Sequence, residues 1–312
     1  MASPPTFIMS LDCEGKWGMA DHLRPYHHRD LTTPKIIGAY RRLLDMLASH
    51  DIAATFAFVM AFALADGERR DLPILEERNP RDRWLAHYWR CLDAGLDDGW
   101  HVPEAFEMVR DAGRHELASH GFCHRPLGDG WIDPAGAAAE LADAAKVAKL
   151  KGIAFETLVF PRNEVGNLKA VRAAGYSGYR ERLLRPGGRI GRARALVDEF
   201  SVWAGPQPPQ GMKQGLVAIP AGRFFNWRFG ARRLVPPAVT IARWRRQLDE
   251  CVRHGGVVHL WLHPHNFITG PGTAEVLETV LGDAARHRDA GRISVLTQRD
   301  YCLREAGIER AA

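Results

Sequence analysis

The sequence lacks any apolar run long enough to span a membrane. Its first residues, M-A-S-P-P, have neither the basic nor the apolar region of an export signal. The five cysteines are odd in number and show no paired spacing, which indicates reduced thiols rather than a disulfide framework. From these absences we expect the protein to stay in the cytoplasm, where it is made.

The sequence also lacks internal repeats, low-complexity tracts and any linker that would divide it, so we expect one domain over residues 1–312. Its hydrophobic content of 46% and charged content of 25% are ordinary for a globular protein. The net charge of +5 permits an anionic partner, such as a phosphate-bearing substrate, a lipid head group or nucleic acid, without requiring one.

What is present is an alternation of strand-like and helix-like segments. Helices are expected to begin near Thr33, Pro103, Pro134, Leu168, Pro237 and Thr273, and a capping pattern at Thr297 begins the last one. Short apolar runs that alternate with these helices predict parallel strands at 7–11, 52–59, 115–119, 156–160, 177–180, 216–220, 257–262 and 293–296. This alternation predicts an α/β protein, with the strands arranged as a barrel.

Two segments interrupt the alternation. Residues 60–102 form an insertion that is either a surface helix pair packed by its own aromatic residues or a lid over a site. Residues 181–215 are rich in Gly, Pro and Arg, and we predict irregular structure there with a helix near Leu196.

Acids and imidazoles follow three of the predicted strands. Asp12 and Glu14 stand two apart at the end of the first strand, so their side chains share one face, while Cys13 points the other way. His120 and His124 follow the third strand at a spacing that places both imidazoles on one side of a helical turn. His263 follows the strand 257–262.

This combination of residues is typical of a metal-dependent hydrolase. Imidazole nitrogens and carboxylate oxygens bind zinc, and a catalytic site leaves one position for water. His120, His124 and one carboxylate supply three ligands, the other carboxylate can act as general base, and His263 can protonate a leaving amine. The residues alone leave open which carboxylate is the ligand. Each group also has a structural alternative, such as a helix cap for an acid or a hydrogen-bonded pair for the two histidines.

The segments D-C-E-G at 12–15, H-G-F-C-H at 120–124 and L-W-L-H at 260–263 resemble the ordered motifs of the polysaccharide deacetylase family (carbohydrate esterase family four, the NodB-homology fold). The first segment matches the D-x-E variant of a motif in which the two acids are more often adjacent. The resemblance covers essentially the whole chain. It implies a distorted (β/α) barrel of seven or eight mostly parallel strands, one bound divalent ion that is usually zinc, and hydrolysis of an N-acyl amino sugar.

The resemblance also implies individual roles. Asp12 would be the base, Glu14 the ligand with His120 and His124, and His263 the acid. Phe160-Pro161-Arg162-Asn163 stands where the family has an R-x-P motif, so Arg162 would orient the base and Asn163 would lie near the substrate. The family's Asp-Trp motif has no clear counterpart in this sequence.

Two further residues are candidate substrate contacts. His265 follows the proposed acid, and Trp17 lies just past the acidic loop, where its ring could stack on a sugar or fill the barrel mouth.

Arginines alternate with aromatic residues in R-F-F-N-W-R-F at 223–229, and further arginines follow. Such a pattern is found on solvated helix faces, at phosphate or glycolipid sites and at membrane surfaces. We expect a solvated face first and a glycolipid or nucleotide-sugar phosphate site second. No nucleic-acid motif accompanies the charge, so we expect no nucleic-acid partner.

From the sequence we expect removal of an N-acetyl or N-formyl group from an amino sugar or glycan in surface-polysaccharide or lipopolysaccharide assembly. The substrate would be a cytosolic, phosphate-bearing or lipid-linked precursor, which allows a peripheral membrane contact. The alternatives are hydrolysis of a small non-sugar amide or cyclic ureide, and a catalytically silent metal- or carbohydrate-binding module. The sequence does not determine the oligomeric state.

Overall fold

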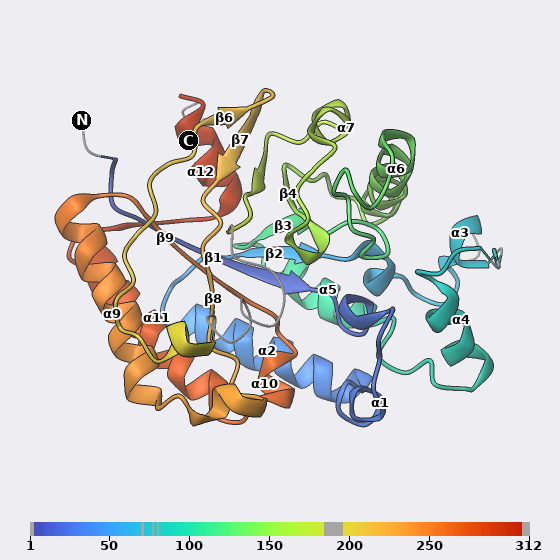
Figure 1. Ribbon diagram of the computed structural model, residues 1–312, viewed down its shortest axis with the longest axis horizontal. Helices are drawn as coiled ribbons and strands as arrows, with labels where there is room; N and C mark the ends of the chain where they lie inside the picture. The colour runs from blue at the N-terminus through green and yellow to red at the C-terminus, as the bar shows by residue number, and fades with distance from the viewer. Residues whose placement is uncertain (1–2, 70–71, 77, 80, 184–195, 308–312) are drawn as a thin grey trace.

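The computed structural model describes residues 3–69, 72–76, 78–79, 81–183 and 196–307. In this part of the chain, ten strands form one curled sheet with the order β6-β7-β5-β4-β3-β2-β1-β9-β8, and β10 pairs with β1 beside β2 (Figure 1). All pairings between these strands are parallel except that of β6 with β7. The strands are β1 Thr6–Cys13, β2 Thr55–Phe58, β3 Glu116–Ser119, β4 Thr157–Val159, β5 Gly178–Arg180, β6 Met212–Lys213, β7 Leu216–Ile219, β8 Arg223–Phe224, β9 Val257–Leu262 and β10 Ser294–Leu296.

The helices connect the strands and cover the outside of the sheet. They are α1 Pro25–Asp30, α2 Thr33–Ser49, α3 Pro73–Glu76, α4 Ala86–Asp93, α5 Pro103–Asp111, α6 Pro134–Leu150, α7 Leu168–Ala173, α9 Pro237–His254, α10 Asn266–Thr269, α11 Thr273–Asp289 and α12 Gln298–Glu305. The curled, mostly parallel sheet with its helices is a distorted (β/α) barrel, so the predicted fold class is confirmed.

The core follows the apolar patterns of the sequence. Every residue of β1 is buried, as expected of a central parallel strand covered on both faces. Helix α2 buries the stripe that contains Ile36, Tyr40, Leu43 and Leu47 against the sheet. Asp133 caps α6 through the amide of Gly136, and Thr297 forms a capping box at the start of α12.

Aromatic residues of the insertion at 60–102 pack on Trp17, which lies outside it, and on the loop at 120–124, where the Trp84 indole donates to the carbonyl of Cys123 at 2.9 Å. Tyr88 and Trp100 are buried with Trp17, and their ring centroids lie 4.8 and 4.9 Å from that of Trp17. Helices α3 and α4 lie at the edge of the molecule in Figure 1. The insertion therefore combines an outer helix pair with an aromatic residue that packs beside His124.

No helix in the described ranges combines the length and the apolar character needed to cross a membrane.

Candidate active site

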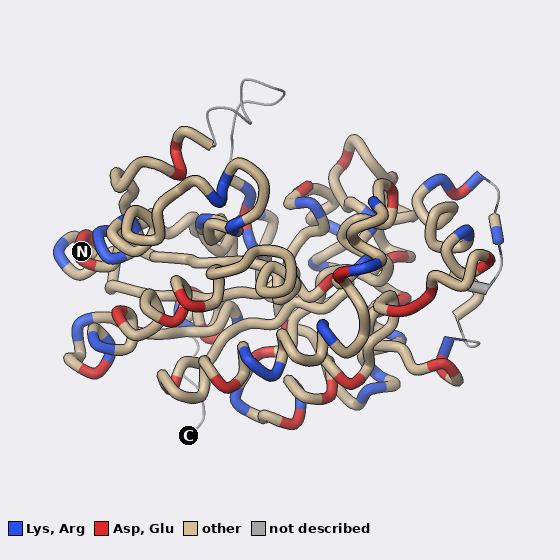
Figure 2. Tube along the Cα trace, turned by 90° about the horizontal axis from the view of Figure 1, so that it is seen from below, with Lys and Arg blue, Asp and Glu red and all other residues tan. Residues whose placement is uncertain are grey.

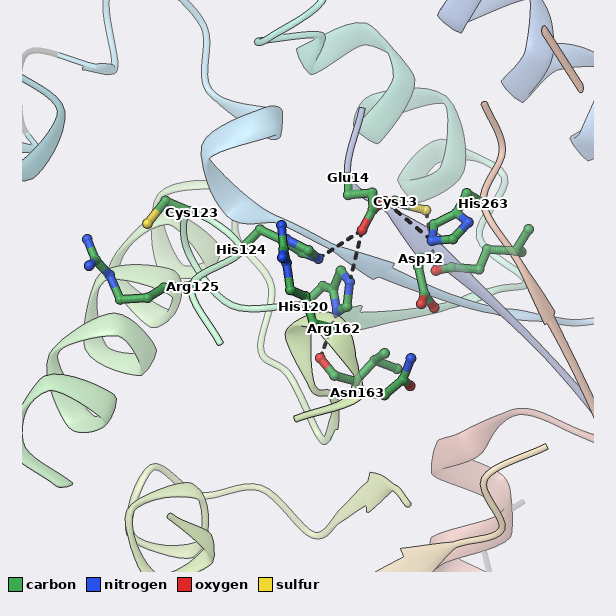
Figure 3. Close-up of polar contacts among 12 residues, drawn as sticks. Asp12, Cys13, Glu14, His120, Cys123, His124, Arg125, Arg162, Asn163 and His263 are labelled. Atoms are coloured by element: carbon green, nitrogen blue, oxygen red, sulfur yellow. Dashed lines mark hydrogen bonds and ion pairs between the residues drawn. The ribbon is translucent and has the colours of Figure 1, made fainter. Parts of the chain in front are cut away.

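The candidate residues meet because their strands are neighbours. The sheet order places β3, β2, β1 and β9 side by side and parallel, so their carboxyl ends share one rim. Asp12 is the last residue but one of β1, Glu14 follows that strand, His120 follows β3 and His263 follows β9. Figure 3 shows the three imidazoles of His120, His124 and His263 around the Glu14 carboxylate.

Glu14 is the centre of the cluster. Its Oε2 lies 2.9 Å from Nε2 of His124 and 3.4 Å from Nε2 of His120, and its Oε1 lies 3.3 Å from Nε2 of His263. The backbone of Gly18 lies so close to this carboxylate that any Cβ there would overlap it. Residue 18 therefore has to be glycine if Glu14 is to keep this position.

The three buried residues Glu14, His120 and His124 fit a divalent ion. Nδ1 of His120 lies 2.7 Å from the carbonyl of Val159, so it donates there and leaves the Nε2 lone pair facing Glu14. That Nε2 is buried and has no hydrogen-bond partner, which is costly unless a ligand takes it. The ligand atoms of the three residues lie within 4.8 Å of one another. Two imidazoles and a carboxylate are a common donor set for catalytic zinc.

The electrostatics favour the ligand forms of these side chains. Burial acts to raise the pKa of Glu14, but the opposing charge of His263 is the largest influence that holds it well below its ordinary value. Burial lowers the pKa of His124 despite the opposing charge of Glu14. An ionised carboxylate and a neutral imidazole are what a metal ion requires.

Two other groups have metal-ligand geometry in the described residues. One is Glu14 with His263 and His265, which shares the same carboxylate. The other is His28 with His87 and Cys91, but Nζ of Lys16 lies 3.4 Å from Nδ1 of His28. An ammonium group at this distance opposes binding of a second cation.

The segment from His120 to His124 is a loop, and the predicted helical turn is wrong. Gly121 and His124 have φ angles of 78° and 63°, which a helix does not allow. Oε1 of Glu140, on α6, accepts the amides of Phe122 and Cys123 at 2.9 and 2.8 Å. This buried carboxylate replaces the carbonyls that a helix would have offered, and it fixes the loop that carries both imidazoles.

Asp12 is held by Arg180 rather than by Arg162. Nη1 and Nη2 of Arg180 each donate to one oxygen of Asp12 at 2.7 Å, and both side chains are buried. Burial acts to raise the pKa of Asp12, but the charge of Arg180, that of His120 and the two hydrogen bonds hold it below its ordinary value. Arg162 instead pairs with Asp21 and lies over the ring of Trp84, 5.0 Å from its centroid.

Sequence reasoning missed Arg180 and the residues that fix it. Its guanidinium also donates to Ser10 Oγ at 3.1 Å and to Asn163 Oδ1 at 3.0 Å, and it lies 4.4 Å from the centroid of the Trp261 ring. Ser10 Oγ in turn lies 2.9 Å from Nε2 of His259. The available signal was an arginine at the carboxyl end of the predicted strand 177–180, the same rim that carries Asp12.

His263 faces the cluster from the opposite side. Its backbone amide donates to Oδ1 of Asn266 at 3.1 Å, and its ring stacks on that of His265, with centroids 4.9 Å apart and an angle of 18°. His265 is nearly buried, and burial lowers its pKa to about 3. His265 therefore supports the ring of His263 and also reaches the adjoining cavity.

Trp17 does not reach the site. It has no exposed surface, and its indole donates to the carbonyl of Trp100 at 2.7 Å. Its ring is therefore unavailable for stacking on a sugar, and it fills space at the barrel mouth, which was the alternative interpretation.

A cavity of about 810 Å³ adjoins Glu14, His263 and Asn163. Its walls are largely aromatic and apolar, and they include Phe224, Trp227, Phe229 and Trp261. The rings of Trp227 and Phe229 stack at 4.7 Å with an angle of 6°. A ligand that occupies this cavity would reach the carboxylate and the imidazole directly.

No protein-family model matches the sequence. A search of curated proteins finds no match. Solved structures do match over nearly the whole chain. A protein of Mycobacterium smegmatis that is assigned to the polysaccharide deacetylases is similar with a TM-score of 0.57 at 16% identity, covering 100% of this chain and 98% of that one. A protein of Pseudomonas aeruginosa PAO1 with the same assignment has a TM-score of 0.57 at 12% identity, covering 97% and 92%.

The chain has the polysaccharide deacetylase fold. The same fold occurs in Puue allantoinase, with a TM-score of 0.55 at 13% identity, covering 96% of this chain and 89% of that one. The polysaccharide deacetylase fold thus carries more than one activity at this level of similarity, and the reaction has to be argued from the site.

Proposed function

We propose that the protein is a metal-dependent hydrolase that removes an N-acetyl or N-formyl group from an amino sugar. The observation that carries this proposal is the arrangement around Glu14. Two imidazoles approach one of its oxygens, an arginine-bound carboxylate lies beside it, and a third imidazole approaches its other oxygen. These groups would supply a ligand set, a base and an acid at one rim, which supports the proposal.

Glu14, His120 and His124 would hold one divalent ion, for which zinc is the natural choice with these donors. When bound, the ion supplies a water of lowered pKa and polarises the amide carbonyl. The Asp12 carboxylate takes the proton of the attacking water, and Arg180 keeps that carboxylate ionised and fixed in orientation. His263 gives a proton to the departing nitrogen, which is a poor leaving group as an anion.

The substrate class and cellular setting extend this proposal. Similarity to proteins assigned as polysaccharide deacetylases supports an amino sugar or glycan. We propose a cytoplasmic reaction on a precursor, phosphate-bearing or lipid-linked, in the assembly of a surface polysaccharide or lipopolysaccharide. Asn163, which binds Arg180 and lines the cavity, would contact the substrate together with His265.

Hydrolysis of a cyclic ureide or another small amide is the second candidate. The similarity to an allantoinase favours it, since that protein shares the fold over nearly the whole chain. A panel that contains N-acetyl and N-formyl amino sugars, simple acetamides and allantoin would separate the two candidates.

Metal content and turnover, measured on the same preparations, test the proposal. The purified protein should hold about one divalent ion per chain, the stoichiometry of a mononuclear site. His120→Ala should lose the ion, whereas Asp12→Asn should keep it and lose turnover by ~10²–10⁴-fold, as expected for a general base. His265→Ala is the matched control for metal content, because it changes a neighbouring imidazole outside the proposed ligand set.

Three results would contradict the proposal. Retention of the ion in His120→Ala would exclude this ligand set, and its loss in His265→Ala alone would point to the group that includes His263. Binding of the ion without turnover on any amide of the panel would indicate a catalytically silent metal-binding module.

A further inference from the structure

The segment from Phe200 to Leu248 contains no acidic residue, although Asp and Glu make up 37 of the 312 residues. It contains eight basic residues: Lys213, Arg223, Arg228, Arg232, Arg233, Arg243, Arg245 and Arg246. Over much of the rest of the chain, acidic and basic residues alternate along the backbone (Figure 2). The excess of basic over acidic residues is therefore concentrated in this segment. It is larger there than in the whole chain, whose net charge is +5.

Part of this segment surrounds the cavity beside the active site. Ala231 and Arg232 line the cavity from a short helical turn, Gly230–Leu234, and Phe229 lines it from the position just before that turn. Leu196 lines it from a second turn at 196–199. Phe229 and Ala231 are exposed, so the cavity reaches the surface between these two turns.

Large apolar side chains project into solvent from both turns and from the residues next to them. Leu234 and Val197 are each 69% exposed, and Trp203 is 73% exposed. Arg246 of α9 lies over the Trp203 ring, 4.2 Å from its centroid, so Trp203 lies against α9, the helix that follows Leu234 in the chain. Exposed apolar groups of this size are unfavourable in water and mark an interaction surface.

The charge of this surface stays positive after its ion pairs are counted. Acidic side chains pair with five of the eight basic residues: Glu181 with Lys213, Asp198 with Arg223, Asp198 and Glu199 with Arg243, Asp283 with Arg245, and Glu250 with Arg246. Arg228 donates to backbone carbonyls, which leaves its charge uncompensated. Arg233 is exposed next to Leu234, and none of the ion pairs between described residues includes it. We name Val197, Trp203, Phe229, Arg233 and Leu234 the basic apolar face.

We propose that the basic apolar face docks on an anionic lipid bilayer. Apolar side chains enter the boundary between head groups and acyl chains, and Arg233 binds a head-group phosphate. A nucleic acid would match the charge but not the aliphatic Leu234 and Val197, which offer no flat ring for stacking.

The apolar cavity opens at this face, so an apolar part of a membrane-bound substrate could enter it. This last step rests on the proposed function, whereas the docking itself does not.

Vesicle sedimentation tests the docking. The protein should pellet with phosphatidylglycerol–phosphatidylcholine vesicles, much less with phosphatidylcholine alone, and less at high salt. Arg233→Glu/Leu234→Asp should weaken binding by about tenfold or more, since it reverses one charge and removes one apolar anchor. The control is Lys149→Glu/Leu150→Asp, an exposed Lys-Leu pair at the end of α6, far from α9 in Figure 1. It changes the net charge by the same amount and should bind as the unaltered protein does.

Absence of binding to anionic vesicles, or equal loss in the two double variants, would overturn the proposal. Binding of RNA in place of vesicles, with loss in Arg233→Glu/Leu234→Asp, would also overturn it and assign the face to nucleic acid. Turnover of a small soluble N-acetyl amino sugar should be the same in both double variants. If vesicle binding follows the prediction while no amide is hydrolysed, the docking stands and the proposed function fails.

Discussion

At the scale of single residues, the contact between Arg180 and Asp12 sets the protonation of the proposed base. Arg180 holds the pKa of Asp12 below its ordinary value, so the carboxylate is ionised throughout the neutral range. Arg180→Lys keeps a positive charge but loses the two-pronged contact. The pKa of Asp12 should therefore rise, and the acid limb of kcat/KM should move to higher pH.

The chain offers a matched control for this prediction. The control is Arg162→Lys. The family motif assigns Arg162 the role of orienting the base, but in the structure Arg162 pairs with Asp21. The pH profile of this variant should be unchanged. A shift in Arg162→Lys with none in Arg180→Lys would return the orienting role to Arg162.

Replacing His263 should reduce the rate of hydrolysis more for a substrate with a poor leaving group than for one with a good leaving group. As the proton donor, it is needed for an amide, whose nitrogen must be protonated, and less for an aryl acetate, whose phenolate leaves unaided. His263→Ala should keep the metal ion, lose amide hydrolysis by ~10²–10⁴-fold and retain relatively more ester hydrolysis. Equal losses on both substrates would show another role, and loss of the ion would make His263 a ligand.

At the scale of elements, α6 controls the loop that carries two of the proposed ligands. Glu140 accepts the amides of Phe122 and Cys123, and burial raises its pKa despite these bonds. Glu140→Ala leaves two buried N–H groups without a partner, which costs about 1–3 kcal/mol for each. Both the free energy of unfolding and the metal affinity should fall.

Glu140→Gln distinguishes loop support from a need for charge. Its amide oxygen can still accept both N–H groups, so it should restore most of the metal affinity that Glu140→Ala loses. Urea denaturation and metal titration measure the two effects. Failure of Gln to restore affinity would mean that the negative charge itself is required.

The sequence predicted the regular elements well because their signals are local. The strand at 257–262 was predicted with its observed bounds, and the cap at Thr297 was found because a capping side chain lies within three residues of its partner. The loop at 120–124 was mistaken for a helical turn, because Glu140 fixes it from a helix further along the chain. Spacing alone could not reveal that contact.

The restriction of sequence signals to local contacts also explains which residues of the site were predicted and which were missed. Asp12, Glu14, His120, His124 and His263 each follow a predicted strand, and parallel topology brings such positions to one rim. Arg180 meets Asp12 across 168 positions of sequence, and that pairing depends on which strands face each other inside the curled sheet. Part of the segment 181–215, predicted to be irregular, lies outside the described residues, and its end forms β6.

At the scale of the whole molecule, buried neutral histidines link stability to pH. Burial lowers the pKa of His101 and of His259 to about 3, with the charge of Arg69 adding to the effect for His101 and that of Arg180 for His259. In the unfolded chain a histidine takes up a proton near pH 6.5. Below that pH the unfolded state binds more protons than the native state, so the free energy of unfolding should fall as pH decreases from 6.5 toward 3.

Urea denaturation at pH 7.5, 6.5 and 5.5, with a chelator present to exclude metal release, measures this dependence. His101→Gln should flatten the decline, because it removes one of the differential protonation sites. Exposed His254→Gln is the control and should leave the slope as it is. A free energy of unfolding that stays constant between pH 7.5 and 5.5 would contradict the prediction.

The two ends of the sheet have a consequence for self-association. The sheet terminates in β6 on one side and β8 on the other, and each has only two residues. To add to the edge of an open sheet, a strand from a second molecule must pair with a row of unpaired backbone groups that is longer than two residues. The long apolar strands β1 and β9 lie inside the sheet and become available only when it opens. Aggregation should therefore follow partial unfolding, and the folded protein should resist strand-by-strand polymerisation even when it is concentrated.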